Sequence, residues 1–384
     1  FKVQQAMVAW YSGAAAHWEG VAIPALACDV VLTLCGKVSV PRGTMHGYFH
    51  SIFRCAVDHG AVIRTCCPVD EIMVNNGRAV GVRLRDNAAK AEKTIWADKA
   101  VISDVDILQT FNTLIGPQHL DRAFLQRIND ISLKGGSIYV SHILTREKLR
   151  ARKQFHSELM GDEAGLGPYP CDSRDIYYEH VADVDGRKGD ITMPPERLMW
   201  LGTPSNRFGD QHQQSTRPNG HVMSPFYVYV PPPEYHPDGA DAIDKKKEYW
   251  NGYMRQAFSQ VIENLDDDNI IHHWANTPYE SEFRNAGFIG GTWCGTRHCE
   301  DQFWTERPLP ELARYRTPID GLYLCHQTAA HPGGLCLMAV TYNLMHMLIE
   351  DGLAEPGDWW YPSPWYIPER GKISAVPREG KVAA

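Results

Sequence analysis

The spacing of apolar positions changes along the chain, and the changes mark regions of different secondary structure. Over residues 1–34 apolar side chains recur at helical spacing. Short apolar runs typical of strands then follow, at 61–65, 69–74, 79–84, 94–97 and 99–104. Asn76-Gly77 between two of these runs predicts a tight hairpin turn. The pattern therefore predicts a helical segment, a β-meander and a returning strand.

The regions around and after the meander alternate between helical and strand patterns. A helix is expected to end at Asp58, where Gly60 suits a left-handed cap, and residues 108–131 are expected to be helical. Strands are expected at 136–140 and 223–230, with one long helix at 244–264. These elements predict an antiparallel sheet with a covering helix. Past residue 351, prolines and tryptophans predict a tail without regular structure that packs on a domain or subunit surface.

Composition narrows the class of protein. The 384 residues are enough for two domains, and the net charge of −8, with both signs interspersed, argues against binding to nucleic acid. No apolar run approaches the roughly 20 residues that span a bilayer. The ten cysteines show no repeated spacing, which favours reduced thiols over disulfides and predicts a cytoplasmic protein. Lone histidines such as His298 are more often satisfied core groups than ligands, so no metal site is predicted.

One stretch carries the strongest chemical signal. Residues 321–334 combine an apolar strand, a polar break and a glycine-rich turn, and an apolar helical run follows, which is typical of the last FAD-contacting strand and helix of a flavoprotein. Such proteins open on G-x-G-x-x-G, the backbone cradle for a pyrophosphate. The nearest match, at 165–170, lacks the third glycine and carries two prolines. The chain is therefore interpreted as the second part of a flavoenzyme.

Several segments, taken in order, resemble one family. They lie at 41–45, 60–65, 69–72, 77–82, 101–104, 134–137, 288–292, 302, 307–310 and 315–325. Together they are similar to the phytoene-desaturase-like family of FAD-dependent oxidoreductases, near the carotenoid desaturases and retinol saturase and within the amine-oxidase-like superfamily. The resemblance covers most of the chain from 41 to 352 and lacks only the N-terminal G-x-G-x-x-G unit.

The resemblance implies a fold of class α/β plus α+β. Part of a doubly wound FAD-binding domain, with the inserted β-meander, is joined to an antiparallel-sheet substrate domain. The implied division along the chain is a helical segment of the substrate domain at 1–40, FAD domain at 41–115, substrate domain at 116–286, FAD domain at 287–352 and the tail at 353–384.

The resemblance also implies FAD as the cofactor and assigns residues to it. The implied cofactor contacts are Val69, Ser103, Asp104, Cys325, His331, Pro332, Gly333, Gly334 and Leu335. Glycines there would allow close approach of backbone to the flavin. The cofactor carries the hydride chemistry of the family, and the protein supplies position and electrostatics.

The chain departs from the family pattern beside this stretch. His326 stands where relatives have glycine, and bulky Cys336, Leu337, Met338 and Val340 stand where they have small residues. His331 and His326 are the candidate catalytic residues, because an imidazole titrates near neutrality, although each could instead be a structural strut. Aromatic residues that could line a substrate channel, or simply fill the core, are Tyr227, Tyr229 and Trp293.

These observations lead to a first hypothesis and two alternatives. The first is the C-terminal component of an FAD-dependent oxidoreductase that dehydrogenates a largely apolar small molecule. A separate polypeptide with the G-x-G-x-x-G unit completes it in a hetero-oligomer, and the chain alone is expected to be inactive, because half a doubly wound sheet exposes an edge. The alternatives are amine-oxidase-like C–N oxidation and a flavin-free scaffolding component of such a complex.

Overall fold

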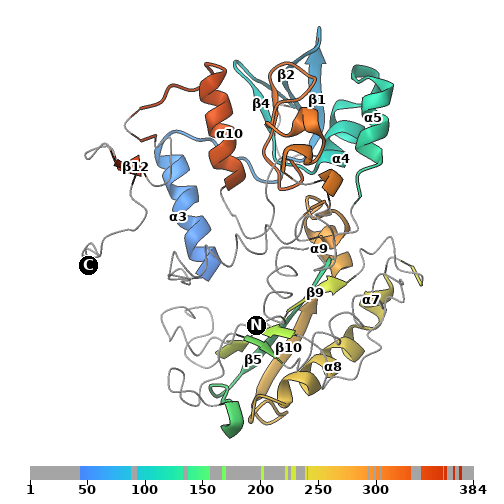
Figure 1. Cartoon of the computed structure of the whole chain (residues 1–384), viewed down its shortest axis with the longest axis vertical. Helices are drawn as coiled ribbons and strands as arrows, with labels where there is room; N and C mark the ends of the chain where they lie inside the picture. Colours follow the sequence, from blue (N-terminus) through green and yellow to red (C-terminus); the bar gives the residue numbers. More distant parts are fainter. Residues whose placement is uncertain are drawn as a thin grey trace.

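The computed structural model describes part of the chain, and its elements fall into two groups (Figure 1). The described residues are 44–87, 93–132, 137–155, 167–169, 200–202, 221–223, 226–230, 238–239, 241–292, 295–296, 300–302, 304–329, 339–357, 359–360, 366–367 and 372–373. The predicted helical segment at 1–34 lies outside them. One group holds the meander, a parallel strand pair and helices α3 and α10, and the other holds a larger sheet and helix α8.

The β-meander matches its sequence prediction. Strands β1 (Val69–Asn75), β2 (Arg78–Leu84) and β3 (Thr94–Trp96) form an antiparallel sheet in that order. Asn76 and Gly77 both adopt positive φ, 48° and 78°, as the two central residues of a type I′ turn require. This short-range signal was sufficient because the turn conformation is decided within its own residues.

A two-stranded parallel sheet lies next to the meander. It pairs β4 (Val101–Ser103) with β11 (Leu322–Leu324), two segments more than 200 residues apart in sequence. The meander joins it where the amide of Ala79 donates to the carbonyl of Asp320 at 2.8 Å. Helix α10 (Ala339–Glu350) buries Val340, Leu344 and Leu348 in the hydrophobic core of this group.

The second group is built on a six-stranded antiparallel sheet. Its order is β10-β5-β9-β7-β6, and β8 also pairs with β5. The strands are β5 (Ser137–Thr145), β6 (Gly167–Tyr169), β7 (Trp200–Gly202), β8 (His221–Met223), β9 (Phe226–Val230) and β10 (Ile270–Asn276). Helix α8 (Lys247–Ser259) covers one face through Trp250, which stacks on Tyr139 with ring centroids 5.3 Å apart. Mixed α/β content with an antiparallel sheet agrees with the predicted class.

Two predicted helices are broken. The region 108–131 divides into α4 (Ile107–Gln109), a π-helix (Thr110–Ile115), a 3₁₀ turn (Pro117–His119) and α5 (Arg122–Asn129). Gly116, with φ of 85°, and Pro117 interrupt the helical ladder there. The expected helix at 244–264 is α7 (Ala242–Lys245) and then α8, because the backbone of Lys246 leaves helical geometry. Ile262, expected on that helix, instead bridges Ala151.

Three strand or tail predictions were wrong. Residues 61–64 follow α3 (Thr44–Asp58) without forming a strand, and they pair with no strand in the described part of the chain. The expected strand at 223–230 is divided into β8 and β9, with Pro225 between them. The tail does contain regular structure, since β12 (Tyr366–Ile367) pairs with β13 (Lys372–Ile373). Its Trp360 stacks on Tyr342 of α10 at 5.2 Å.

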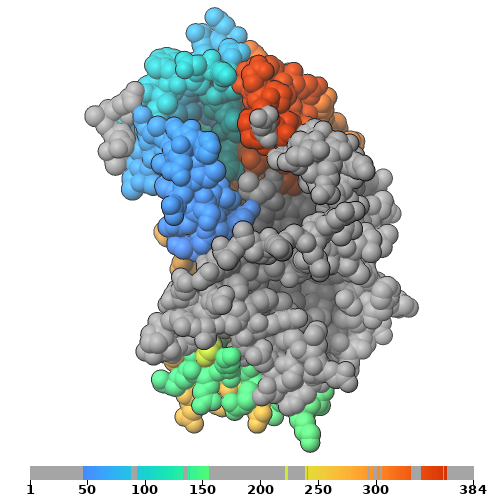
Figure 2. Space-filling view, turned by 90° about the vertical axis from the view of Figure 1, so that its left-hand side faces the viewer, coloured from blue at the N-terminus to red at the C-terminus, as the bar shows by residue number. Residues whose placement is uncertain are grey.

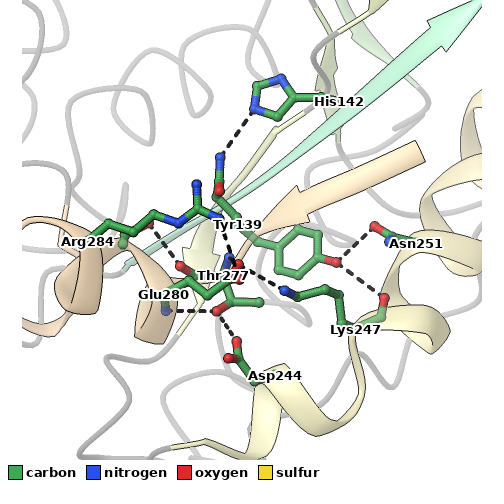
Figure 3. Close-up of polar contacts among 10 residues, drawn as sticks. Tyr139, His142, Asp244, Lys247, Asn251, Thr277, Glu280 and Arg284 are labelled. Carbon is green, nitrogen blue, oxygen red and sulfur yellow. Dashed lines mark hydrogen bonds and ion pairs between the residues drawn. The ribbon is translucent and has the colours of Figure 1, made fainter. Parts of the chain in front are cut away.

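A polar junction ties the larger sheet to helix α9 (Pro278–Arg284) (Figure 3). Thr277 caps α9 and donates to the carboxylate of Asp244, while Lys247 pairs with Glu280 at 2.9 Å. The Tyr139 hydroxyl donates to Asn251 Oδ1 at 3.0 Å. The chain runs from α9 into a 3₁₀ turn (Ile289–Gly291) and toward the parallel pair, so this junction links the two groups. Within the described residues, the remaining 3₁₀ turns are Lys153–Phe155, Glu300–Gln302, Trp304–Glu306 and Pro310–Leu312.

Candidate functional site

The carboxyl ends of β4 and β11 form the candidate site. Parallel strands end at the same edge of a sheet, and ligands of open α/β sheets bind outside that edge. Here Ser103 ends β4, and the amide of Cys325, just after β11, donates to the Ser103 carbonyl at 2.8 Å. Two residues that the sequence assigned to the cofactor are thereby brought together from distant parts of the chain.

Asp106 organises the segment that follows β4. Its fully buried carboxylate caps α4 by accepting from the amides of Leu108 and Gln109 at 2.9 and 3.0 Å. Burial raises its pKa, and these hydrogen bonds oppose the rise. The Gln109 side chain donates both to Asp106 and to the carbonyl of Ala286. Asp106 thus connects the end of β4 with the segment after α9.

Asp104 and Cys325 are the polar groups at the strand ends. Asp104 is exposed at the surface, yet the surrounding protein raises its pKa by desolvation. Burial likewise raises the pKa of the half-buried Cys325 thiol, which lies 3.8 Å from Thr341 Oγ1. In both groups, desolvation is the cause of the raised pKa, which shows that the protein limits the access of water to this edge.

His326 is held on both ring nitrogens. The amide of Thr328 donates to Nδ1 at 3.2 Å, and a backbone hydrogen bond joins the ring to Gly287. Burial lowers the pKa of His326 to about 4. The imidazole is therefore neutral at pH 7, and its hydrogen bonds orient the turn that leads toward residues 331–335. This geometry favours a positioning role over proton transfer.

Thr328 and Arg307 complete the support of that turn. Thr328 Oγ1 accepts from the amide of Ile107 at 3.0 Å, which ties the turn to α4. The fully buried Arg307 guanidinium donates to the Gln327 carbonyl at 2.9 Å. Three separate segments, near 106, 287 and 307, therefore converge on the four residues after β11.

Val69 lies at the matching end of the meander. It starts β1 and pairs with Leu84, the last residue of β2. Because β2 begins beside Asp320 and runs parallel to β11, this end of the hairpin lies on the carboxyl side of the parallel pair. That position agrees with the cofactor role assigned to Val69 without testing it.

Several predicted site residues fall outside this geometry. His331, Pro332, Gly333, Gly334, Leu335 and Trp293 lie outside the described residues. For Tyr227 and Tyr229 the structure gives the backbone of β9, with Tyr227 paired to Tyr139, but not the side chains. Their roles remain predictions.

Sequence reasoning missed Asp106, Gln109, Thr328 and Arg307. For Asp106 a signal was present, because an aspartate with glutamine three residues on, directly after a strand, is a helix-start pattern. Arg307 lies in one of the segments that resemble the family, but its supporting role was not predicted, since its burial depends on segments brought together only by folding.

A cavity formed by described residues lies at the opposite end of the strands. It measures about 380 Å³ and lies beside Gly321, at the amino end of β11. Four of its charged groups form ion pairs, Arg78 with Asp320 at 2.7 Å and Arg316 with Asp351 at 2.7 Å, and Lys99 donates to the carbonyl of Leu353. It is therefore a gap in an ion-pair network and not the site predicted for a flavin.

The carboxyl edge fits part of a flavin dinucleotide. Backbone groups at the ends of two parallel strands, an exposed protonatable carboxyl and a half-buried thiol suit hydroxyl and ring edges. No phosphate cradle occurs among the described residues at this edge. Over the same residues, no three His, Cys, Asp or Glu side chains are grouped to hold a metal ion, and no helix is long and apolar enough to cross a membrane.

The sequence is similar to those of several known proteins. The sequence profile described as GMC oxidoreductase matches residues 30–114. The rat pyridine nucleotide-disulfide oxidoreductase domain-containing protein 2 is 27% identical over 325 residues, which cover 82% of this chain and 52% of the relative. A limonene dehydrogenase subunit of Castellaniella defragrans is 21% identical over 328 residues, covering 84% of this chain and 57% of that relative.

A solved structure also aligns. An oxidoreductase from Methanosarcina mazei superposes with a TM-score of 0.46 at 13% identity, covering 81% of this chain and 55% of that one. The chain spans about half the length of the relatives that it matches. The narrower phytoene-desaturase-like resemblance stays a prediction. The matches support FAD as the cofactor of this chain, and the matched profile and relatives are named as oxidoreductases or a dehydrogenase subunit.

Proposed function

We propose that the chain is the C-terminal component of an FAD-dependent oxidoreductase that dehydrogenates a largely apolar small molecule. A nucleotide-binding unit with the G-x-G-x-x-G cradle, on a separate polypeptide, completes the site at the carboxyl ends of β4 and β11. The comparisons support FAD as the cofactor, and one relative is named as a dehydrogenase subunit.

The observation that carries this proposal is the exposed apolar face of α3. Phe49, Phe53 and Val57 form one stripe and are 44–49% exposed, and Figure 2 shows α3, in blue, at the surface. Val62 and Ile63, just beyond the helix, are 80% and 46% exposed. We call these five residues the α3 surface. An amphipathic helix normally buries its apolar face, and a parallel sheet of only two strands is incomplete.

The occupant that fits the α3 surface is the missing βα unit. It would add parallel strands to the β4–β11 pair and cover the apolar stripe. It would also pair with the backbone of residues 61–64, which would then form a further strand. A helix of that unit would also supply the phosphate cradle absent from the described part of this chain. One added unit would thus account for the two-stranded sheet, the unpaired residues 61–64 and the exposed apolar stripe.

The residues of this chain are proposed to hold and orient the cofactor. Asp104, Cys325 and the backbone after β11 are proposed to hold it, together with residues 331–335, and Val69 is proposed to contact its nucleotide end. When bound, FAD accepts the hydride that leaves the substrate carbon. His326 orients the turn, while His331 is the proposed group for any proton transfer.

One feature argues against the flavin-free alternative. Val340, one of four bulky residues that replace small ones in the family pattern, packs into the core with Leu344 and Leu348. Its side chain is therefore accommodated within this core, and it gives no reason to exclude a flavin.

The test measures association and flavin together. The protein is purified from its natural source, and its components are identified by intact mass and its flavin by visible absorption. The expected result is a flavin-bearing complex with a second chain. A colourless species with the mass of this chain alone contradicts the proposal.

A pair of variants locates the contact. Phe49→Glu with Phe53→Glu is expected to abolish co-purification of the second chain and of flavin, because it places charges in the buried contact. Ser51→Glu is the control, since Ser51 is exposed on the opposite side of the same helix. Equal association of both variants would show that α3 is not the contact.

A further inference from the structure

Helix α3 carries two histidines one turn apart. His46 and His50 are four residues apart, so they lie on the same side of the helix, and both are exposed. Their ring centroids are 4.4 Å apart, and the ring planes are inclined by 34°. Figure 2 shows the helix, in blue, at the surface of the molecule. A small ligand in solution can therefore reach both imidazoles at once.

Neither of these imidazoles is used by the fold. Apart from the contact between the two rings, neither forms a hydrogen bond or an ion pair with the described residues. His326 and His273 are different, because Thr328 and Ser141 hold their rings by hydrogen bonds. Histidines held in that way are structural groups, whereas the ring nitrogens of His46 and His50 are open to a ligand.

The spacing of the pair suits chelation of a metal ion. Imidazole is a ligand for Zn²⁺, Ni²⁺ and Cu²⁺, and two histidines at positions i and i+4 of a helix can bind one ion together. Metal–nitrogen bonds of about 2.0–2.1 Å place two coordinating nitrogens roughly 3–3.5 Å apart. Rings with centroids 4.4 Å apart reach this separation by small side-chain rotations. The helix therefore holds the pair close to a chelating geometry.

The pair forms an open site. No three His, Cys, Asp or Glu side chains are grouped for a metal ion among the described residues, so the helix supplies two protein ligands and no more. Structural zinc sites have four protein ligands and catalytic sites three, and water fills the positions that protein does not. Arg54, one turn beyond His50, is exposed, so water and salt screen its repulsion of a cation. The expected ion is exchangeable.

We propose that His46 and His50 bind one divalent transition-metal ion through one ring nitrogen each. Phe53 and Val57 follow His50 by three and seven residues, so the ion lies on the same side of α3 as the apolar stripe. A protein that covers the α3 surface would meet the open positions of the ion. The proposal goes beyond the proposed function and does not depend on it, because both ligands belong to this chain.

The test is a calorimetric titration of the full chain with NiCl₂, which counts the bound ions and measures their affinity. His46→Ala and His50→Ala are each expected to weaken one ion about 100-fold, because the remaining imidazole binds without a second ligand beside it. The double variant is expected to lose the same single ion and no more. Two independent histidine sites would instead lose one ion in each single variant and two in the double variant.

Two control variants carry substitutions away from the pair. His119→Ala removes an exposed histidine that has no other histidine within four positions. Cys55→Ala removes an exposed thiol on the opposite side of α3, where its sulfur lies 3.8 Å from His59 Nδ1. Cys55 and His59 are the other candidate ligands at this spacing on α3. Both control variants should keep the ion with unchanged affinity.

Three results would overturn the proposal. They are equal Ni²⁺ binding by the native chain and both single variants, loss of the ion in a control variant, and loss of two ions in the double variant. Circular dichroism of each variant excludes unfolding of the helix as the cause of a loss. Metal binding requires neither flavin nor a second chain, so this proposal and the proposed function can fail separately.

Discussion

Helices α3 and α8 are similar in length and in amphipathic pattern but differ completely in burial. Every described side chain of α3 is exposed or half-buried, with Phe53 49% exposed. In α8, Trp250, Met254 and Phe258 are at most 2% exposed. The difference lies in what each helix faces, because α8 packs on a six-stranded sheet and α3 has no comparable surface within the described residues.

This contrast distinguishes a region with a complete hydrophobic core from a region with an uncovered apolar face. The sheet with α8 has its own buried core, whereas the apolar face of α3 is not buried against the described residues. Amphipathic sequence specifies that a face should be buried, but it does not supply the surface that buries it.

The largest expected effect distinguishes the two helices directly. Trp250→Ala should lower the free energy of unfolding by about 3–5 kcal/mol, through lost transfer energy and a cavity under Tyr139. Phe53→Ala should change it by less than about 0.5 kcal/mol in the isolated chain, because its ring already contacts water. Urea denaturation of both variants measures this. If Phe53→Ala is as costly as Trp250→Ala, α3 is buried in the isolated chain and the contrast is wrong.

The second effect is a pH dependence to which each region contributes one histidine. Burial lowers the pKa of His273, hydrogen-bonded to Ser141, and of His326 to about 4 in the folded protein, against 6.5 for a free imidazole. The unfolded chain therefore binds protons more readily. Stability should be full above pH 6.5 and fall as the pH decreases toward 4.

The midpoint of urea unfolding between pH 7.5 and pH 4.5 checks this expectation. His273→Gln and His326→Gln should each flatten the curve, and the double variant should flatten it further. Glutamine keeps a hydrogen-bonding side chain without a titratable group. A native protein as stable at pH 4.5 as at pH 7.5 would contradict the burial of both rings.

The smallest effect concerns the ion pairs at the amino end of β11. Hydrogen bonds from Arg316, and then from Tyr323, lower the pKa of Asp351 to about 2. This stability is present above pH 3.8 and lost as the pH falls through 2. Asp351→Asn should cost about 0.5–1 kcal/mol at pH 7, less in high salt, because the pair is near the surface.

The matched control for that pair is Glu355→Gln, an exposed carboxylate four residues further on. It should leave the free energy of unfolding unchanged within error. An equal loss in both variants would mean that net charge, and not the Arg316–Asp351 pair, accounts for the effect.

Elements whose structure is determined by a few neighbouring residues were predicted well. The Asn76-Gly77 turn and its flanking strands follow from two residues and an apolar pattern. The end of α3 at Asp58 with Gly60 in positive φ follows from helix-cap chemistry. Predictions failed where the outcome depended on a partner, as for residues 61–64, or on a break such as Gly116 or Lys246.

The candidate site shows the same division. Motifs after β4 and β11 pointed to Ser103, Asp104 and Cys325, and the strands do meet there. His326 was proposed as a catalytic group, but its environment is set by Thr328 and Gly287, which the motif does not reveal. The support from Asp106 and Arg307 was not foreseen for the same reason.

Local sequence was thus sufficient for the meander, the helix ends and the position of the flavoprotein motifs, because turns, caps and apolar spacing act over a few residues. Only the tertiary structure decided which strands pair, which faces are buried and how each histidine titrates. These properties depend on contacts between residues that can be more than 200 positions apart, as in β4 and β11, and on the water that those contacts exclude.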